Sequence, residues 1–378
     1  MKIIHAIFSF NVGGSETMLV DILNQQCKEA SVSLIIVNEK LNIDLLNTID
    51  KRVNIHLLRR KEGNKIQLLS AFFKINQILK RINPDVIHCH DNKLFPFFVN
   101  FGKKSCLTVH NVQLSALFLK SYKKIFAIST AVQDDVKKRT GILASVVYNG
   151  IEIEQYKRRT VYEFDRENET FTIALLSRLF PEQKGQHIAM QSIRILKEQD
   201  INVKLYLIGA GDTDKKIRLK ELAVRYDIER QVEFLGLVDR QWIKNNLKNY
   251  HLLIQPSLYE GFGITIIEGF ACGLPVVASD LDGPEEIFRL LNAGLLVQAN
   301  DPVDLAEKIF TVYQSYVSNT LKCHNYILKD KNHLRIFDIR NTSREYFNNY
   351  SLAILNQNVR KDMYNQTTKF RNENTDCQ

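Results

Sequence analysis

Two carboxylates, Glu260 and Glu268, stand in a glycine-containing segment between two short apolar runs, Leu252–Ile254 and Pro275–Ala278. The letters EGFGITIIEGFACG predict a loop followed by a helix that begins near Gly263. Because the helical part is apolar almost all round, the helix should be buried, and its one acid then needs a hydrogen-bonding partner. A ribose diol offers two hydroxyl donors and is such a partner; an ordinary surface carboxylate is the alternative.

The backbone of the same loop is suited to close contact with a ligand. Gly261 and Gly263 would let it approach an anionic or hydroxyl-rich molecule. In an open parallel sheet, ligands bind beyond the carboxyl ends of the strands, where helix N-termini direct free N–H groups outward. We therefore expect a ligand at this loop.

Two cations follow another apolar run, Phe171–Leu176, in the segment LLSRLFPEQKGQH. Arg178 offers a planar fork and Lys184 a point charge, and both are groups that bind phosphate. A loop carrying the two beyond a strand end could neutralise a phosphoryl leaving group as its bond breaks. Without other evidence, Arg178 and Lys184 would each be an ordinary surface cation. The presence of Glu260 and Glu268 in the same half of the chain favours a binding site.

These residues need strands to position them, and the chain supplies two sets. Short runs rich in Val and Ile alternate with longer stretches of helical period, which is typical of βα units around a parallel sheet. The charged stretch Ile151–Thr170 suits a linker between two domains. The strand candidates are, in the first half, Ile3–Phe8, Val32–Val37, Val53–Leu57, Val86–Cys89, Cys106–Val109, Lys124–Ile128 and Ser145–Val147, and in the second, Phe171–Leu176, Lys204–Ile208, Val232–Phe234, Leu252–Ile254, Pro275–Ala278 and Gly294–Val297.

The segments with the acids and the cations resemble the signature of family 4 retaining glycosyltransferases (glycosyl transferases group 1). The resemblance rests on the E-G-F-G start, the E-x7-E spacing, the following G-x-P-V-V-A-S-D, and the cation loop, where Ser177 replaces the usual Gly. It implies an α/β GT-B fold, with two Rossmann-like domains whose parallel sheets face each other across a cleft. Residues 1–155 would bind the acceptor and residues 156–340 the nucleotide sugar, while 341–378 would form a helix packing back on the first lobe and a polar tail.

The resemblance also assigns roles. Glu268 would hold the ribose hydroxyls, Glu260 would contact the donor sugar, and Arg178 with Lys184 would bind the diphosphate. The backbone of five consecutive residues would line the sugar and phosphate site: Gly261, Phe262, Gly263, Ile264 and Thr265. Contacts elsewhere would come from Gly13 and Gly14 at the donor phosphates, Gly209 near the nucleotide and Leu237 near the base.

His110 ends the segment SCLTVH at a strand's carboxyl edge, from which an imidazole could reach the sugar hydroxyls or the reacting centre. A lone histidine is more often structural, but the family's T-x-H at this place favours the contact. With Glu260, Arg178 and Lys184 it completes the expected catalytic set. Ser129 is expected mainly to cap the following helix.

His88 and His90 should share one face of a strand, with Asp91 beyond it. Two ligands do not make a site and the sequence shows no second cluster to complete one, so we predict no metal here. His90 is a candidate acceptor contact instead. The sequence also has no D-x-D pair placed to clamp a metal–diphosphate, so we expect no metal cofactor, with the cations acting in its place.

The formal charge of +9 is uneven. Residues 1–155 hold 21 Lys and Arg against 13 Asp and Glu, whereas the remainder holds 30 against 29. Basic clusters in the first half could attract anionic lipid headgroups or a phosphorylated acceptor, and a solvated surface is the alternative. The clusters are Arg59–Lys61, Lys103–Lys104, Lys123–Lys124 and Lys137–Arg139.

The expected location is the cytoplasm, including the inner face of its membrane. The six cysteines are scattered without a C-x-x-C pair, and no stretch has the roughly eighteen apolar residues that span a bilayer. The start MKIIHAIF suits a buried strand better than a signal peptide.

The implied function is a hexosyltransferase that takes a sugar from a UDP- or GDP-sugar and retains its anomeric configuration. A surface polysaccharide (lipopolysaccharide, capsule) or a lipid-linked oligosaccharide precursor is the expected acceptor. Alternatives are a nucleotide-sugar epimerase or phosphorylase of the same fold, and a basic protein that binds a membrane surface or nucleic acid. Binding of nucleic acid is disfavoured because it would give Glu260 and Glu268 no function. A dinucleotide oxidoreductase is disfavoured because neither half of the chain has a complete G-x-G-x-x-G loop.

Overall fold

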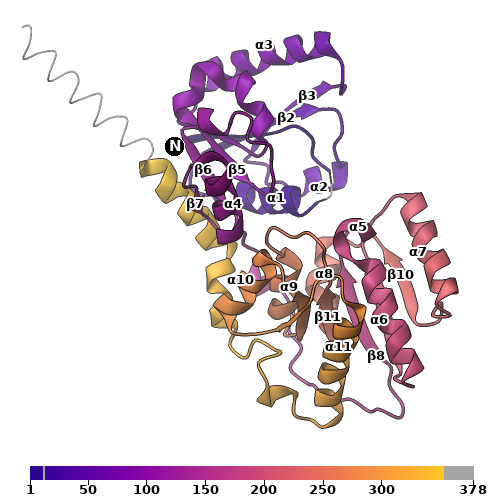
Figure 1. Cartoon of the computed structure of the whole chain (residues 1–378). Helices are drawn as coiled ribbons and strands as arrows, with labels where there is room; N and C mark the ends of the chain where they lie inside the picture. Colours follow the sequence, from indigo (N-terminus) through magenta and orange to yellow (C-terminus); the bar gives the residue numbers. More distant parts are fainter. Residues whose placement is uncertain (12, 353–378) are drawn as a thin grey trace, which may run out of the picture. The chain divides into compact units, whose positions relative to one another are not determined.

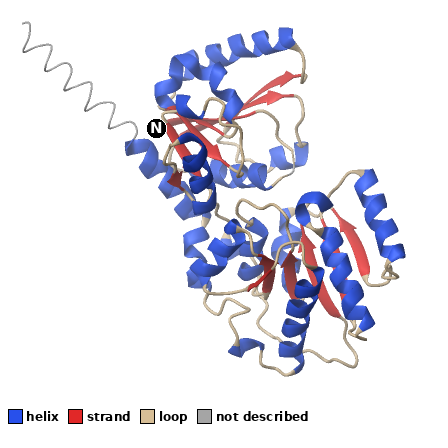
Figure 2. Ribbon diagram, in the orientation of Figure 1, coloured by secondary structure: helices blue, strands red, loops and turns tan. Residues whose placement is uncertain are grey.

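The computed structural model describes residues 1–11 and 13–352, which form two compact units. Each unit is built on one parallel sheet with helices packed on its faces (Figures 1 and 2). The prediction of an α/β fold with two Rossmann-like domains is therefore confirmed. One unit comprises Met1–Ile128, Val132–Val147 and the segment from Arg340 onward; the other comprises Ser129–Ala131 and Tyr148–Ile339.

The first unit has a seven-stranded sheet in the order β3-β2-β1-β4-β5-β6-β7, with every pair parallel. The strands are β1 (Lys2–Ile7), β2 (Ser31–Asn38), β3 (Asn54–Arg60), β4 (Val86–Cys89), β5 (Ser105–Val109), β6 (Lys124–Ala127) and β7 (Ser145–Val146). The helices are α1 (Gly14–Gln26), α2 (Ile43–Asn47), α3 (Lys65–Ile82) and α4 (Thr130–Thr140), with 3-10 segments η1 (Asn92–Lys104) and η2 (Leu119–Ser121).

The core of this unit follows from the alternation of apolar residues. Leu19 and Leu23 on one side of α1 pack on Leu34 and Ile36 of β2, and all four are fully buried. Burying each such side chain contributes roughly 1.5–3 kcal/mol. These contacts hold α1 over the sheet and so fix the loop that connects β1 to it.

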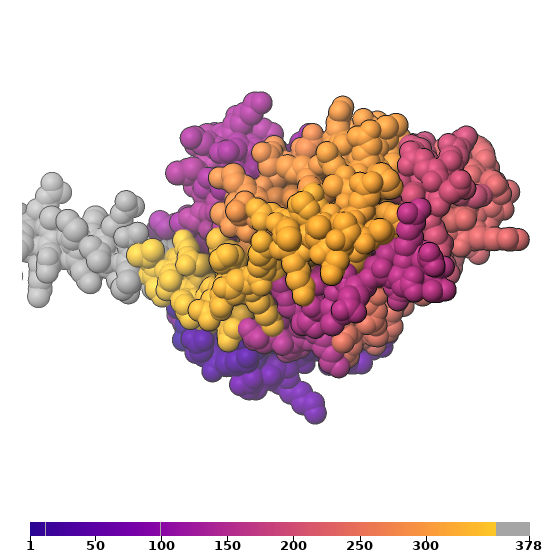
Figure 3. All heavy atoms as spheres, turned by 90° about the horizontal axis from the view of Figure 1, so that it is seen from below, coloured from indigo at the N-terminus to yellow at the C-terminus, as the bar shows by residue number. Residues whose placement is uncertain are grey.

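A helix over residues 339–352 completes the first unit. Its Tyr346 and Tyr350 are fully buried, and both rings pack on Phe126 of β6 and on His88 of β4. The end of the described chain therefore lies beside strands that are far away in sequence (yellow in Figures 1 and 3). The predicted polar tail lies outside the described residues.

The second unit has a six-stranded parallel sheet in the order β10-β9-β8-β11-β12-β13. Its strands are β8 (Phe171–Leu176), β9 (Val203–Ile208), β10 (Val232–Gly236), β11 (Leu252–Gln255), β12 (Val276–Ser279) and β13 (Leu295–Val297). Its helices are α5 (Pro181–Lys184), α6 (Gln186–Glu198), α7 (Thr213–Arg225), α8 (Arg240–Asn246), α9 (Ile264–Ala271), α10 (Asp282–Leu291) and α11 (Pro302–Val317), with 3-10 segments η3 (Ile153–Gln155), η4 (Leu247–Asn249), η5 (Leu321–Cys323) and η6 (Lys331–Phe337).

The strand orders mark where ligands can bind. In the second sheet β8 lies between β9 and β11, so the chain turns to opposite sides after β8 and after β11. In the first sheet β1 lies between β2 and β4 in the same way. Such switch points leave a crevice beyond the strand ends. The loop with Arg178 and Lys184 and the loop with Glu260 both leave the second sheet at its switch point.

Among the described helices, none is both long enough and apolar enough to cross a bilayer.

Candidate active site

The loops after β8 and β11 meet through an ion pair. Lys184 Nζ lies 2.7 Å from Glu260 Oε2, and both side chains are mostly buried, with 16% and 15% of their surface exposed. Gln255 Nε2 donates to the same oxygen at 2.7 Å, and Thr265 Oγ1 donates to Gln255 Oε1 at 2.7 Å. Four side chains from two loops, a strand end and a helix start thus form one connected polar group.

The backbone holds the two loops together at the same place. Gly185 has φ +67°, and a Cβ there would lie 1.8 Å from the carbonyl oxygen of Pro256, so only glycine fits. Leu258 N also donates to the Gln183 carbonyl at 2.8 Å. The position of Lys184 is therefore fixed by a close approach of two chain segments more than 70 residues apart in the sequence.

Arg178 is exposed at the end of β8 and has no ion-pair partner in residues 1–11 and 13–352. Its backbone is held firmly, because the buried Gln186 donates from Nε2 to the Arg178 carbonyl at 2.8 Å and to Ser177 Oγ at 2.9 Å. The departure from the family's glycine at Ser177 is thus accommodated by a specific hydrogen bond. The guanidinium remains available to an anion.

Glu268 lies on α9 with only 7% of its surface exposed, as expected for a helix that is apolar almost all round. Tyr156 Oη donates to Glu268 Oε1 at 2.7 Å. The acid therefore has a protein partner, and its need for a partner does not by itself call for a ribose. The role assigned to Glu268 by resemblance stays a prediction.

The segment from Gly261 to Thr265 offers its backbone rather than its side chains. α9 starts after Gly263, which has φ +111°, and no side chain caps this helix start. Phe262 is buried between Tyr148 and Phe337, at ring distances of 6.1 and 5.7 Å, so its side chain is an anchor. Uncapped N–H groups at a helix start are suited to an anion.

The anchoring extends to two residues whose part the sequence did not reveal. Ser129 Oγ donates to the Gly261 carbonyl at 2.8 Å. Glu286, which is buried, accepts from Thr130 N at 2.8 Å and from Tyr148 Oη at 2.7 Å. Burial and the Glu286 carboxylate both raise the pKa of Tyr148, so that phenol stays a donor.

Gly209 and Leu237 lie at the same edge of the sheet as Arg178. Gly209 N donates to the Gly236 carbonyl at 2.8 Å, and a Cβ at Gly209 would lie 2.0 Å from the Ser177 carbonyl oxygen. Leu237, beyond β10, is 57% exposed. The structure thus gathers Arg178, Lys184, Gly209, Leu237 and Glu260 at one edge of the second sheet.

The remaining expected residues belong to the first unit. Gly13 and Gly14 stand at the start of α1, where no side chain caps the helix; Val12 beside them lies outside the described residues. His110 follows β5 and is half-buried, and burial lowers its pKa to about 4, so it is neutral at pH 7. That these three face the same ligand as Arg178 stays a prediction.

One argument from the sequence was wrong. We expected nothing to complete the pair His88 and His90, but β1 pairs in register with β4 and places His5 beside His88. Nitrogens of the three rings lie within 4.8 Å of one another. The third histidine was missed because only strand register, which one sequence does not show, brings it there.

The switch point of a doubly wound sheet is where such folds bind their ligands, and comparison with known families gives the class of this protein. Residues 159–330 match the model of glycosyl transferases group 1, and residues 12–155 match the model of glycosyltransferase family 4. The chain belongs to the family 4 glycosyltransferases with the GT-B fold. The family and the transferase class predicted from the sequence are both confirmed.

Similar proteins come from all domains of life. An uncharacterized glycosyltransferase of Methanocaldococcus jannaschii is 27% identical over 82% of this chain and 87% of its own length. The gpi3 subunit of the phosphatidylinositol N-acetylglucosaminyltransferase of Schizosaccharomyces pombe is 24% identical over 68% of this chain and 59% of its own. The crystal structure of Anabaena HepE with UDP and glucose superimposes with a TM-score of 0.75 at 22% identity, covering 93% of this chain and 99% of HepE.

Proposed function

We propose that this chain is a retaining hexosyltransferase that moves a sugar from a UDP- or GDP-sugar to a glycan or lipid-linked acceptor of a surface polysaccharide pathway. The observation that carries the proposal is the Lys184–Glu260 pair at the switch point, with the exposed Arg178 at the neighbouring strand end. The HepE complex with UDP and glucose and the lipid named in the gpi3 transferase support the two substrate classes.

The proposed chemistry needs fixed positive charge where the diphosphate departs. Arg178, Lys184 and the N–H groups at the start of α9 would supply it, and such preorganised donors are worth most in a site that excludes water. Glu260 would contact the donor sugar rather than attack it, because its Oε2 is already bound by Lys184 and Gln255. His110 would accept or donate a hydrogen bond at the sugar, and the acceptor would attack from the face that the diphosphate leaves.

The donor can be identified without knowing the acceptor. In a thermal-shift panel of UDP- and GDP-sugars, the preferred donor should raise the melting temperature, since a ligand that binds only the folded state stabilises it by about 2.7 kcal/mol at 100 times its Kd. The double variant Arg178→Ala/Lys184→Ala should show no such shift when each sugar nucleotide is compared with the variant's own unliganded melting temperature. No response to any sugar nucleotide would overturn the proposal, and donor conversion without an acceptor would indicate an epimerase.

The acceptor side has a candidate membrane contact on α3. Ile66, Leu69 and Phe73 are 81%, 63% and 64% exposed, and their spacing of three and four residues places them on one face of this helix. The opposite face packs on the sheet through Ala71, Ile75 and Leu79. A helix with an outward apolar face flanked by basic residues is typical of a helix that lies in a membrane interface.

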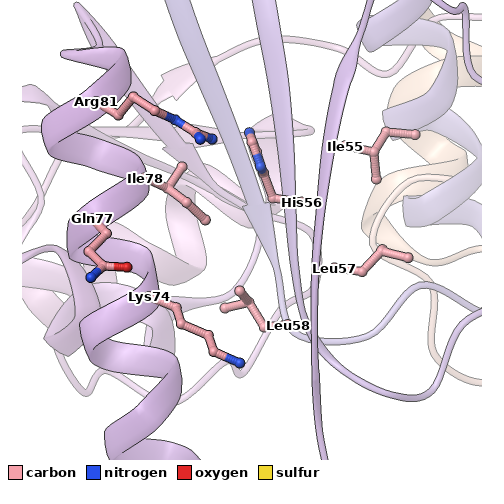
Figure 4. Close-up of a pocket in the computed structure, with 8 residues that line it drawn as sticks. All are labelled: Ile55, His56, Leu57, Leu58, Lys74, Gln77, Ile78 and Arg81. Atoms are coloured by element: carbon pink, nitrogen blue, oxygen red, sulfur yellow. The ribbon is translucent and has the colours of Figure 1, made fainter.

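A basic pocket adjoins this helix. A cavity of about 580 Å³ is lined by residues of α3 and β3, and Lys74 and Arg81 extend into it from the helix (Figure 4). Burial and the nearby Arg81 lower the pKa of His56 on the opposite wall. Because Lys74 and Arg81 are both cations, the pocket is suited to an anionic headgroup. We propose that the enzyme works at the inner face of the cytoplasmic membrane.

Vesicles test this contact. Phe73→Glu should weaken co-sedimentation with vesicles containing anionic phospholipid by about tenfold or more, because it removes apolar contact and adds a repelled charge. Lys216→Glu on α7 introduces the same kind of charge in the second unit and serves as the matched control. Equal binding of both variants, or no binding of the wild type at low salt, would contradict the proposal.

A further inference from the structure

An unbroken row of four polar side chains runs through the first unit and ends at His110. Gln26 Oε1 lies 2.8 Å from His5 Nε2, His5 Nδ1 lies 3.0 Å from His90 Nε2, and His90 Nδ1 lies 3.2 Å from His110 Nε2. The rings of His5 and His90 and those of His90 and His110 stack at interplanar angles of 19° and 26°. Gln26 and His5 are fully buried, while His90 and His110 are half-buried.

The chemistry of imidazole gives this row a direction. Burial lowers the pKa of all three histidines, that of His5 to about 4, so the rings are neutral at pH 7. A neutral imidazole has one N–H donor and one acceptor nitrogen. Gln26 Oε1 can only accept, so His5 Nε2 carries the hydrogen and His5 Nδ1 accepts from His90 Nε2–H. His90 Nδ1 then accepts from His110 Nε2–H.

A second branch holds the buried end in place. His88 Nδ1 lies 2.5 Å from Tyr350 Oη and its Nε2 lies 2.6 Å from Thr108 Oγ1, which in turn lies 3.1 Å from Tyr346 Oη. The His88 ring lies 5.1 Å from the His5 ring, so this branch packs directly against the row. Both ring nitrogens of His5 and of His88 therefore have protein partners, which favours a hydrogen-bond network over metal ligation.

We infer that Gln26, His5 and His90 are positioning residues that hold His110 as its Nε2–H tautomer and leave His110 Nδ1 as a hydrogen-bond acceptor for a sugar hydroxyl. The inference rests on the proposed function for its catalytic meaning, because only there does His110 meet a sugar. The tautomer of His110 can be measured whether or not the protein transfers a sugar. A neutral ring with a fixed acceptor would select a hydroxyl donor at this position.

Nitrogen-15 spectra of histidine-labelled protein report the tautomer directly. We expect His110, assigned through the resonance lost in His110→Phe, to be protonated on Nε2 at pH 7. Gln26→Met should leave His110 as a mixture of tautomers and lower kcat about tenfold with little change in the donor KM. Gln26→Glu, which keeps an acceptor oxygen, should retain the tautomer. The matched control is Gln25→Met, the same change one residue earlier, where the side chain contacts Lys28.

Each outcome is decisive. A His110 protonated on Nδ1, or one unaffected by Gln26→Met, would overturn the inference, and so would histidine resonances that shift on adding Zn²⁺ and return with EDTA. If Gln26→Met does not fold, His90→Phe breaks the same row nearer the surface and His90→Gln restores a donor and an acceptor. A tautomer that responds as expected in a protein that binds no sugar nucleotide would leave the row intact and refute the proposed function alone.

Discussion

Replacing Lys184 with alanine should lower kcat/KM for the sugar-nucleotide donor by about 10²–10³, the effect of removing one preorganised charge partner of a developing anion. Two losses add up. The departing diphosphate loses a cation, and Glu260, whose Oε2 lies 2.7 Å from Lys184 Nζ, is left as an uncompensated negative charge next to it. We expect most of the loss in kcat, because the charge on the leaving group grows in the transition state.

A matched control separates this effect from a general loss of charge. Lys197 pairs with Asp227 at 2.8 Å on the surface of the same unit, so Lys197→Ala removes one cation without touching the site. A double-mutant cycle of Lys184→Ala and Glu260→Gln should show strong coupling, because neutralising Glu260 removes the repulsion that the first change creates. Steady-state kinetics with saturating acceptor measures both. Equal activities of the Lys184 and Lys197 variants would remove Lys184 from the mechanism.

The parts of the site that the sequence predicted are those encoded over short distances. The strand before Arg178 and the strand before Glu260 are marked by apolar runs, and the glycines mark the loops after them. Because parallel strands end at one sheet edge, both loops had to meet if the strands were neighbours. In the structure β8 pairs directly with β11, and the Lys184–Glu260 ion pair joins the two loops.

The missed residues depend on contacts across long stretches of chain. Tyr156 reaches Glu268 over 112 residues and Glu286 reaches Thr130 over 156, and neither partner has a local signal. His5 lies in a strand whose apolar pattern was recognised, but its pairing with β4 depends on register. The exposed apolar face of α3 was missed for a different reason. From the sequence alone its apolar residues are indistinguishable from core residues, and only the packing of the helix on the sheet shows which face is exposed.

Acidification should destabilise the protein between about pH 6.5 and pH 4. Burial lowers the pKa of His5, His110 and His251 to about 4, and lowers those of His88 and His90 well below the ordinary 6.5. Below pH 6.5 the unfolded chain binds protons that the folded chain does not, so the free energy of unfolding falls as the pH falls. For fully buried His5 alone, the loss between pH 6.5 and pH 5 is roughly 2 kcal/mol.

Urea unfolding at pH 7.5 and pH 5 measures this dependence. His5→Gln keeps a polar side chain that does not titrate, so the variant should be less stable than the wild type at pH 7.5 and should lose clearly less on acidification. His333→Gln, at an exposed position in the second unit, is the control and should retain the full wild-type loss. A wild type that is equally stable at both pH values would mean that the buried histidines take up protons in the folded protein over the same pH range as in the unfolded chain, so that burial does not lower their pKa values. The hydrogen-bonded row that ends at His110 would then be lost at pH 5, since a doubly protonated ring has no acceptor nitrogen.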